Sequence, residues 1–526
     1  MSRDPKVLVF GIDGATFDLA QPWVDVGLLP TLRQLMAEGV RAPLRSTVPA
    51  LALPAWTTAA TGCNPGKHNV FSFRAPTFAP GGSRPVSSRD VRRPRVWEIA
   101  AQLGKRSIVL QAPLTDPPRG DVGTVLSGVF TPPGVDEFVA PTRRGRELAS
   151  AVPGYRPDVD TRLLRRGRLA SFRDEALAVQ NLHVDAAAVL LAREPWDLAW
   201  VNFHVLDIVQ HFFWRYMDAE HPAWPGPGPL QHVIRDFYVT LDAALARLLA
   251  IVPDTTTVLL ASAHGVAPLH RYWSTSRWLV DEGLLTLRPE RGLRRLGNLM
   301  RPSARRLQSG VAVADRIDWT ATKAHCVGGA GNGVSVNLRG REPYGIVEPG
   351  AEHDALLSEL RRRLLAWRDP QSGMAVVTAV HRREEIYHGP HRDNAPDLVI
   401  ETDPTVCPVD GLARQVSVAA GIEPDERTGH HAREGMLVLR GPDVRTGLEL
   451  CSVPIDDLAP TVLYLLGVPI DSEMDGRVLT DALDADRLDA QPIATREHPY
   501  QTVDTDLAAD VKVGSLHERP ETLASP

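Results

Sequence analysis

The sequence predicts an α/β fold: a doubly wound, mostly parallel central sheet with helices on both faces and an inserted cap. A short apolar run at residues 7–10 ends in Gly11-Ile12-Asp13-Gly14, which is typical of a buried strand in a parallel sheet. Strand-like runs then alternate along the chain with stretches of helical spacing. The 526 residues suffice for a large core with a cap.

Local periodicity and stop signals predict the individual elements. Residues 29–40 have helical spacing and a glycine stop. The other predicted helices lie at 96–104, 231–251, 354–368 and 456–466, and the other predicted strands at 107–110, 198–203, 257–265, 396–402 and 436–439.

The domain organisation follows from where these patterns weaken. We expect one α/β domain over residues 1–484 and a polar, loosely ordered tail over 485–526. Residues 134–190 and about 270–345 are candidate cap segments. Residues 288–310 carry seven arginines, which indicate either a solvated helical face or a cap that attracts an anionic substrate: Arg288, Arg291, Arg294, Arg295, Arg301, Arg305 and Arg306.

Composition narrows the functional classes. The net charge of -6 gives no support to a nucleic-acid partner. The cysteines Cys63, Cys326, Cys407 and Cys451 lie far apart, which argues against a disulfide scaffold or a cysteine zinc site. We see no signal peptide and no stretch able to span a bilayer, so we expect a cytoplasmic protein without a membrane partner.

Side chains of the metal-ligand type follow several predicted strands. They are Asp13, the i,i+4 pair Asp207 and His211, His264, and His431. One helical face presents both members of an i,i+4 pair, and carboxylate with imidazole suits a zinc ion. Spacing alone leaves a structural role for these residues equally open.

A set of local motifs resembles the alkaline phosphatase superfamily, in its type I phosphodiesterase/nucleotide pyrophosphatase-like branch. The likeness runs from about residue 5 to residue 482. Its motifs are Gly11-Ile12-Asp13-Gly14, Pro54-Ala55-Trp56-Thr57, Thr61-Gly62 with Pro65-Gly66-Lys67-His68, residues 207–214, His264-Gly265, residues 339–347, residues 395–399 and residues 457–461.

The resemblance implies a phosphoryl-transfer site with two metals. Asp207, His211 and His431 match the three ligands of one metal. Asp13 and His264 match an Asp and the His of the second metal, whose remaining ligands are another Asp and a Ser or Thr nucleophile.

The sequence departs from this pattern at two positions. Ala52 stands where the nucleophile belongs, and Ala263 stands where the second Asp belongs. Both losses fall on the second metal site, which keeps too few ligands for a closed zinc shell. We therefore predict one Zn²⁺ at the first site and a weak or empty second site. Phe73 replaces an expected phosphate-binding Asn, which puts a nucleotide substrate in doubt.

Other residues remain as candidates for the chemistry. His204 and His430 adjoin the predicted ligands and would serve as a general base, whereas His325 lies near a cap boundary. Five hydroxyls could replace the missing nucleophile, although helix and loop capping explains them equally: Ser46, Thr47, Thr57, Thr58 and Thr61.

Three functions fit these features. The first is a zinc-dependent enzyme that acts on a small, anionic substrate without a covalent phospho-enzyme. Its reaction would be ester hydrolysis by metal-bound water, or elimination, cyclisation or transfer on a specialised metabolite. The second is an ordinary phosphodiesterase with a substitute nucleophile. The third is a non-catalytic protein that binds a ligand in the same place.

Overall fold

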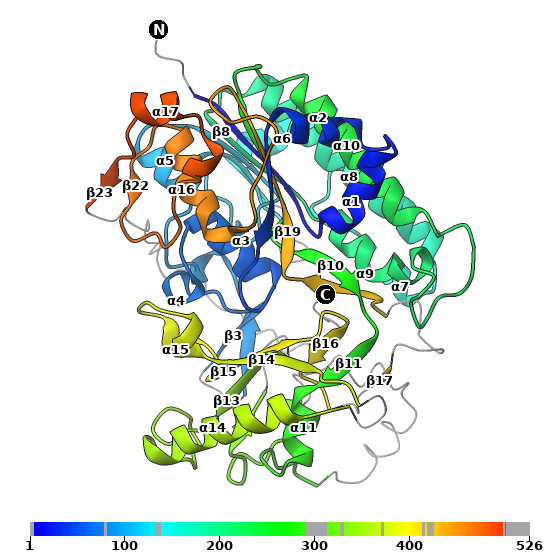
Figure 1. Ribbon diagram of the computed structural model, residues 1–526, viewed down its shortest axis with the longest axis vertical. Helices are drawn as coiled ribbons and strands as arrows, with labels where there is room; N and C mark the ends of the chain where they lie inside the picture. The colour runs from blue at the N-terminus through cyan, green and yellow to red at the C-terminus, as the bar shows by residue number, and fades with distance from the viewer. Residues whose placement is uncertain are drawn as a thin grey trace.

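A central sheet with a helical layer on each face forms the larger part of the molecule, and a smaller part lies below it (Figure 1). The computed structural model describes residues 5–77, 81–129, 131, 138–289, 313–326, 331–369, 373–412, 416–417, 426–497 and 500.

The sheet has ten strands, and its centre is parallel. In spatial order the strands are β20 (Leu448–Glu449), β2 (Val40–Arg45), β19 (Glu434–Arg440), β9 (Thr257–Ala261), β1 (Val7–Ile12), β8 (Leu198–Phe203), β5 (Ser107–Leu110), β6 (Gly123–Leu126) and β7 (Val139–Ala140), with β21 (Val453–Pro454) beside β2. Strands β9, β1, β8, β5 and β6 run parallel, while β19 and β7 are antiparallel to their neighbours. The predicted fold class is confirmed. The carboxyl ends of the central strands meet at one edge, where ligands bind in sheets of this kind.

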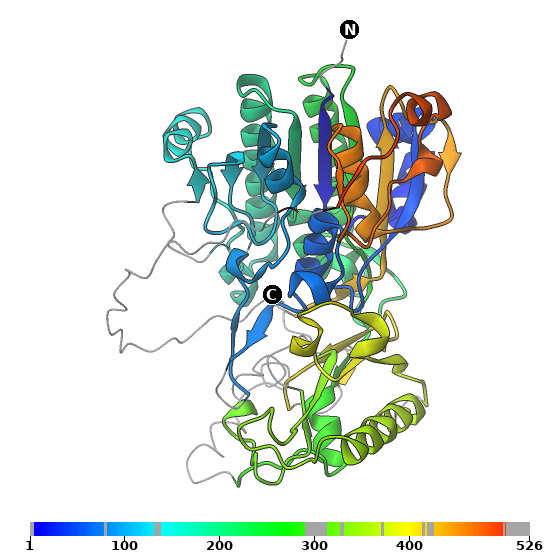
Figure 2. The ribbon, with the colours of Figure 1, turned by 90° about the vertical axis from the view of Figure 1, so that its left-hand side faces the viewer.

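Two hydrophobic cores cover the two faces of the sheet. Alternate residues of β1 divide between them: Leu8 and Phe10 enter one core, and Val7 and Val9 enter the other. The first core is closed by α1 (Phe17–Asp25), α2 (Pro30–Glu38), α6 (Thr142–Ala151), α8 (Leu169–Arg193), α9 (Val205–Met217) and α10 (Val233–Leu249). The second is closed by α3 (Ala52–Thr61), α5 (Val96–Gln102) and α16 (Leu458–Leu465). Figure 2 shows the two layers on either side of the strands.

The smaller part has a core of its own, built between residues 271 and 409. A four-stranded sheet of β12 (Ala324–His325), β13 (Gly333–Val336), β15 (Leu398–Thr402) and β14 (Val377–Arg382) packs against α11 (Thr275–Asp281) and α14 (Ala351–Ala366). A second small sheet contains β16 (Val406–Val409), β11 (Arg271–Ser274) and β17 (Val416–Ser417). The part thus extends well past residue 345, because β14 and β15 complete the sheet that β12 and β13 begin.

The other candidate cap segment lies elsewhere. Helix α6 and most of α8, which ends at Arg193, fall within 134–190 and pack their apolar faces on the central sheet. Of the arginines at 288–310, only Arg288 lies within the described residues.

Part of the C-terminal segment is structured. Helix α17 (Ala485–Ala490) is followed by β23 (Thr495–Arg496), which pairs with β22 (Ile470–Asp471). Tyr500 is buried and donates its hydroxyl to the carbonyl oxygen of Pro469. These contacts hold residues that the sequence predicts to be loosely ordered, and residues 501–526 lie outside the described part of the chain. No helix in the described ranges is both long enough and apolar enough to cross a membrane.

Candidate metal centre

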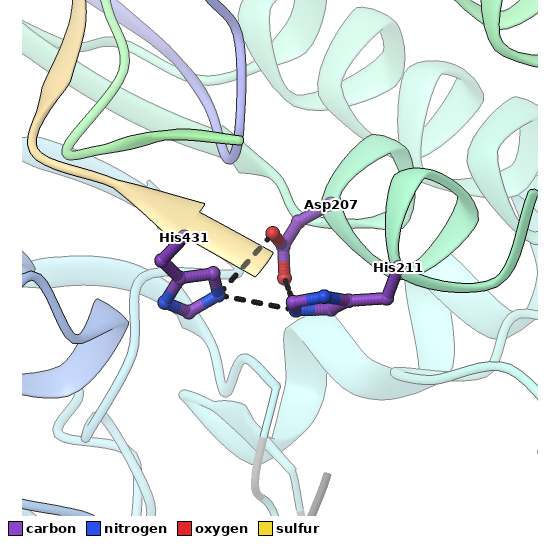
Figure 3. Close-up of side chains that lie close together, drawn as sticks. All are labelled: Asp207, His211 and His431. Atoms are coloured by element: carbon purple, nitrogen blue, oxygen red, sulfur yellow. Dashed lines mark hydrogen bonds and ion pairs between the residues drawn. The ribbon is translucent and has the colours of Figure 1, made fainter. Parts of the chain in front are cut away.

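Asp207, His211 and His431 meet at the carboxyl edge of the sheet, with their side chains turned toward one another (Figure 3). His211 Nε2 lies 3.1 Å from His431 Nε2 and 3.4 Å from Asp207 Oδ2. His431 Nε2 lies 3.4 Å from Asp207 Oδ1. Within the described ranges, this is the one group of three or more His, Cys, Asp or Glu side chains close enough to share an ion.

Two distant segments supply this group. Asp207 and His211 occupy successive turns of α9, which begins at Val205 directly after β8. His431 lies on β18 (Gly429–Ala432), which pairs with β10 (Gly265–Pro268) so that Val266 faces His431. The amide of Thr428 donates to the carbonyl oxygen of His211 at 2.6 Å and joins β18 to α9.

Hydrogen bonds to the backbone set the tautomer of both histidines. His211 Nδ1 lies 2.7 Å from the carbonyl oxygen of Gly429, and His431 Nδ1 lies 3.0 Å from that of Ala50. A carbonyl only accepts, so each Nδ1 carries the proton and each Nε2 keeps a lone pair. Two lone pairs then face each other beside a carboxylate, which is an arrangement that a cation stabilises.

The electrostatics favour a charged carboxylate at Asp207 and a neutral imidazole at His211. Burial by itself would raise the pKa of Asp207, but His211 and His431 outweigh it and hold that pKa well below its ordinary value. Burial lowers the pKa of His211, against the opposing effect of Asp207. Both groups are therefore in the protonation state that metal ligation needs at neutral pH.

The residues predicted for a second metal lie beside this group. Asp13 accepts a hydrogen bond from Trp56 Nε1, and burial followed by the charge of Asp207 raises its pKa to about 7. His264 stacks on His431 with ring centroids 3.9 Å apart. Its Nδ1 faces the carbonyl oxygen of Gly265 at 3.2 Å, and its buried Nε2 has no hydrogen-bond partner among the described residues.

Alanines flank the second position. Ala263 is fully buried directly before His264, and Ala52 is buried at the first residue of α3. Neither methyl group offers a ligand atom. Among the residues that the structure describes, Asp13 and His264 do not join a group of three ligands.

Four of the five candidate hydroxyls are engaged locally. Thr47 donates to the carbonyl of Pro49, and Thr58 Oγ1 contacts His68 Nε2 at 2.9 Å. Thr57 and Thr61 donate to carbonyls of their own helix, those of Leu53 and Thr57 respectively. The exception is Ser46, whose buried Oγ has no partner within the described part of the chain.

The candidate histidines lie in three different environments. His204 occupies the N-cap of α9 and its Nε2 lies 3.3 Å from Asp158 Oδ1. His430 adjoins His431 with its ring 5.8 Å away, and its buried Nδ1 is unpartnered among the described residues. His325 lies in the smaller part, on β12, against Trp319.

Sequence reasoning missed three residues near His183 and His204. Asp158 is the partner of His204, and His183 on α8 has its ring 5.5 Å from that of His204. Gln111, which follows β5, has its Nε2 3.3 Å from Nε2 of His183. A position directly after a predicted strand was the one available signal for Gln111. Asp158 and His183 stand in no pattern that marks them.

The doubly wound sheet, with Asp and His side chains following neighbouring strands, defines a member of the alkaline phosphatase superfamily. The family model described as type I phosphodiesterase/nucleotide pyrophosphatase matches residues 7–431, and the chain belongs to this family of phosphodiesterase-type hydrolases.

The chain is similar to solved structures of low sequence identity, and the one with a TM-score above 0.5 shares its fold. Phosphonoacetate hydrolase from Sinorhizobium meliloti 1021, in complex with phosphonoformate, has a TM-score of 0.54 at 17% identity, over 88% of this chain and 95% of that one. An inactive form of murine ectonucleotide pyrophosphatase/phosphodiesterase 5, in complex with AMP, has a TM-score of 0.49 at 15% identity, over 91% of this chain and 100% of that one. A search among curated protein sequences gave no match.

Proposed function

We propose that this chain is a metal-dependent enzyme that holds one zinc ion with Asp207, His211 and His431 and acts on a small anionic ester. The observation that carries the proposal is that His211 Nε2 and His431 Nε2 lie 3.1 Å apart and each has a lone pair free for a metal ion. Each imidazole is fixed from behind by a carbonyl, as in most histidine metal sites.

The donor set fits zinc in type and spacing. Zinc takes imidazole nitrogen and carboxylate oxygen, and at its usual bond lengths tetrahedral ligand atoms lie about 3.3 Å apart. The 3.1 Å between His211 Nε2 and His431 Nε2 matches one edge of such a tetrahedron. Each of these nitrogens also lies 3.4 Å from an oxygen of Asp207, Oδ2 for His211 and Oδ1 for His431. When bound, zinc would supply Lewis-acid polarisation of a phosphoryl or other ester oxygen and would acidify water.

Two histidines of the chain are candidates for proton transfer near this centre. His204 is the first candidate general base, because the carboxylate of Asp158 fixes its Nε2 at 3.3 Å. His430 is the second, because its Nδ1 is buried and unpartnered among the described residues.

Position 52 has no nucleophilic side chain, and this restricts the reactions open to the enzyme. A methyl group at Ala52 cannot attack phosphorus, so the proposal omits a covalent phospho-enzyme at this position. Direct hydrolysis of the ester, or elimination, cyclisation or transfer on a specialised metabolite, requires no such nucleophile.

The smaller part would act as a cap over this edge of the sheet. Glu401 on β15 contacts Arg433, two residues after His431, at 3.3 Å. Tyr387 donates its hydroxyl to the carbonyl of Val48 at 2.5 Å. Both contacts tie the smaller part to segments that carry or orient the ligand set.

An ordinary phosphodiesterase with a substitute nucleophile is the second candidate, and one observation favours it. The Oγ of Ser46 is buried without a partner among the described residues, close in sequence to Ala50, the carbonyl of which orients His431. This mechanism predicts a phosphorylated Ser46 during turnover.

One experiment separates these functions. The zinc-loaded chain, His211→Ala and Ser46→Ala are assayed with bis(4-nitrophenyl) phosphate and 4-nitrophenyl phosphate, and the quenched protein is searched for a phospho-adduct by mass spectrometry. We expect turnover that zinc removal and His211→Ala abolish, that Ser46→Ala retains, and that leaves no adduct. Unchanged turnover in His211→Ala would refute the proposal. An adduct on Ser46 would support the substitute nucleophile, and tight binding of either ester without turnover would support a ligand-binding protein.

A further inference from the structure

A second polar cluster lies one strand along from the candidate metal centre, at the carboxyl ends of β5 and β8. Gln111 follows β5, His204 follows β8, and His183 reaches them from α8. The segment between α6 and α7 supplies Tyr155 and Asp158. Gln111 and His183 are fully buried and His204 is 2% exposed, so these three side chains lie inside the molecule, whereas Asp158 is about half exposed.

Hydrogen bonds hold one end of each side chain in this cluster. His183 Nε2 donates to the carbonyl of Arg156 at 3.0 Å, and His204 Nε2 donates to Asp158 Oδ1 at 3.3 Å. Gln111 Nε2 donates to the hydroxyl of Tyr155 at 2.7 Å. The rings of His183 and His204 lie 5.5 Å apart.

The other end of each side chain is left without a partner among the described residues. These buried atoms are Nδ1 of His183, Nδ1 of His204 and Oε1 of Gln111. Both amide atoms of Gln180, one turn before His183 on α8, are unpartnered in the same way. Buried polar atoms are nearly always hydrogen-bonded, so a group of unsatisfied ones indicates a ligand.

The protonation of the two imidazoles determines which hydrogen-bonding groups the unpartnered atoms can bind. Because each Nε2 donates, Nδ1 of the neutral imidazole is an acceptor. Burial lowers the pKa of His183 to about 3, so its ring stays neutral at ordinary pH. The cluster therefore offers acceptors that need a hydrogen-bond donor.

We propose that the cluster of Gln111, His183 and His204 binds hydroxyl groups on the non-reacting part of the substrate, an assignment that leaves His430 as the candidate general base. This inference rests on the function proposed above and deepens it by naming the substrate class: a phosphate ester of a polyol or sugar. A hydroxyl donates to an imidazole nitrogen and also accepts from an amide, so it satisfies every atom type present.

Charged groups fit the cluster less well than a hydroxyl. Asp158, its one carboxylate among the described residues, is already engaged by His204, so a buried ammonium would lack a free counter-ion. The guanidinium of Arg156 pairs with Glu175 at 2.7 Å, so an additional phosphate would find no free cation there.

The position of the cluster suits one end of a substrate that has its ester at the metal centre. His204 follows Phe203, the carbonyl of which accepts from the amide of Asp13 at 3.0 Å. Asp207 comes three residues later, on the first turn of α9. An ester near Asp207 would thus direct its alcohol portion toward β5.

The test measures binding, so that it does not depend on turnover. Isothermal titration calorimetry on the zinc-loaded chain compares ribose 5-phosphate and glycerol 3-phosphate with ethyl phosphate, which lacks hydroxyls. We expect at least one polyol phosphate to bind about threefold to tenfold more tightly than ethyl phosphate, the ratio that one or two neutral hydrogen bonds give. His183→Phe should remove this preference and leave the affinity for ethyl phosphate unchanged.

Two further variants serve as a second test and as a control. Gln111→Leu removes a second member of the cluster, in case His183→Phe fails to fold, and Asn181→Ala alters an exposed position of the same helix and should keep the preference. Phosphoethanolamine, which carries an ammonium group in place of hydroxyls, is titrated alongside. Equal affinity for the two polyol phosphates and ethyl phosphate, no binding of any of them, or tighter binding of phosphoethanolamine would overturn the inference. If polyol phosphates are preferred but His211→Ala retains full activity, the proposed metal chemistry fails while the hydroxyl site stands.

Discussion

Three histidines at the candidate centre share one tautomer. In His211, His431 and His264 the Nδ1 faces a backbone carbonyl, so each Nε2 keeps a lone pair. For His211 and His431 that lone pair points into the group that includes Asp207. The Nε2 of His264 is buried and unpartnered among the described residues, as a remnant of a second site would be.

We predict that restoring the two lost groups restores a second metal. Ala52→Thr with Ala263→Asp places a hydroxyl and a carboxylate beside Asp13 and His264, which gives the second position four oxygen or nitrogen donors. The double variant should bind two zinc ions per chain and gain turnover of 4-nitrophenyl phosphate with a phosphorylated threonine at position 52.

The single variants are the matched controls for that result. Each adds one donor and should leave the zinc content of the parent chain unchanged. If the double variant folds but binds no additional zinc, the loss of the second site involves more than Ala52 and Ala263.

At the scale of elements, the centre depends on the contact between α9 and β18. Gly429 fits this contact because a Cβ there would lie 2.6 Å from the carbonyl oxygen of Gln210. Its own carbonyl orients His211, and Thr428 beside it binds the carbonyl of that same histidine. The strand thus brings His431 to α9 and fixes the ring of His211.

Gly429→Ala should weaken zinc binding without touching a ligand. The added methyl group would push β18 away from α9, and the affinity for zinc, measured by competition with a chromogenic chelator, should fall about 10- to 100-fold. Gly228→Ala is the control, because a Cβ on Gly228 meets nothing within 4 Å. An unchanged affinity in Gly429→Ala would show that this contact does not set the geometry.

The sequence predicts the elements better than it predicts their contacts. Strand β8 and the pair Asp207 and His211 follow from an apolar run and from i,i+4 spacing, which are local signals. The approach of His431 to this pair depends on the pairing of β18 with β10, which brings together residues more than 150 positions apart. The match of the motifs to a known family, and not their periodicity, indicated that approach in advance.

Local patterns also fail where a long-range partner decides the environment. His183 lies on a helix with eleven buried residues, where a single histidine is indistinguishable from any other core position. Its contacts with Gln111 and His204 depend on the fold, which brings α8 to the ends of β5 and β8. The sequence of segment 134–190 is equally ambiguous, because an apolar helical face packs on a sheet as readily as in a cap.

At the scale of the whole molecule, buried neutral histidines should make the fold sensitive to acid. Burial lowers the pKa of His68, His183 and His264 to about 3 and that of His325 to about 4. Each folded-state pKa lies below the unfolded value near 6.5, so the unfolded chain binds more protons in that interval. The free energy of unfolding should therefore fall as the pH drops below about 6.

The effect of one histidine can be isolated at His68. Its Nδ1 accepts from the amide of Val70 and its Nε2 contacts Thr58, so protonation breaks a buried arrangement. His68→Gln should reduce the pH slope of the unfolding free energy by up to about 1.4 kcal/mol per pH unit between pH 6 and 4, measured by urea unfolding. His232→Gln, at an exposed position, should keep the parent slope. An identical slope in His68→Gln would contradict the buried neutral state.

The most direct test of the account is the metal content of the purified chain, measured by inductively coupled plasma mass spectrometry after growth with zinc. We predict one zinc ion per chain, lost in His211→Ala and retained in His232→Ala. A chain that takes up no divalent metal, or a His211→Ala variant that keeps its zinc, would contradict the claim that Asp207, His211 and His431 share a single ion.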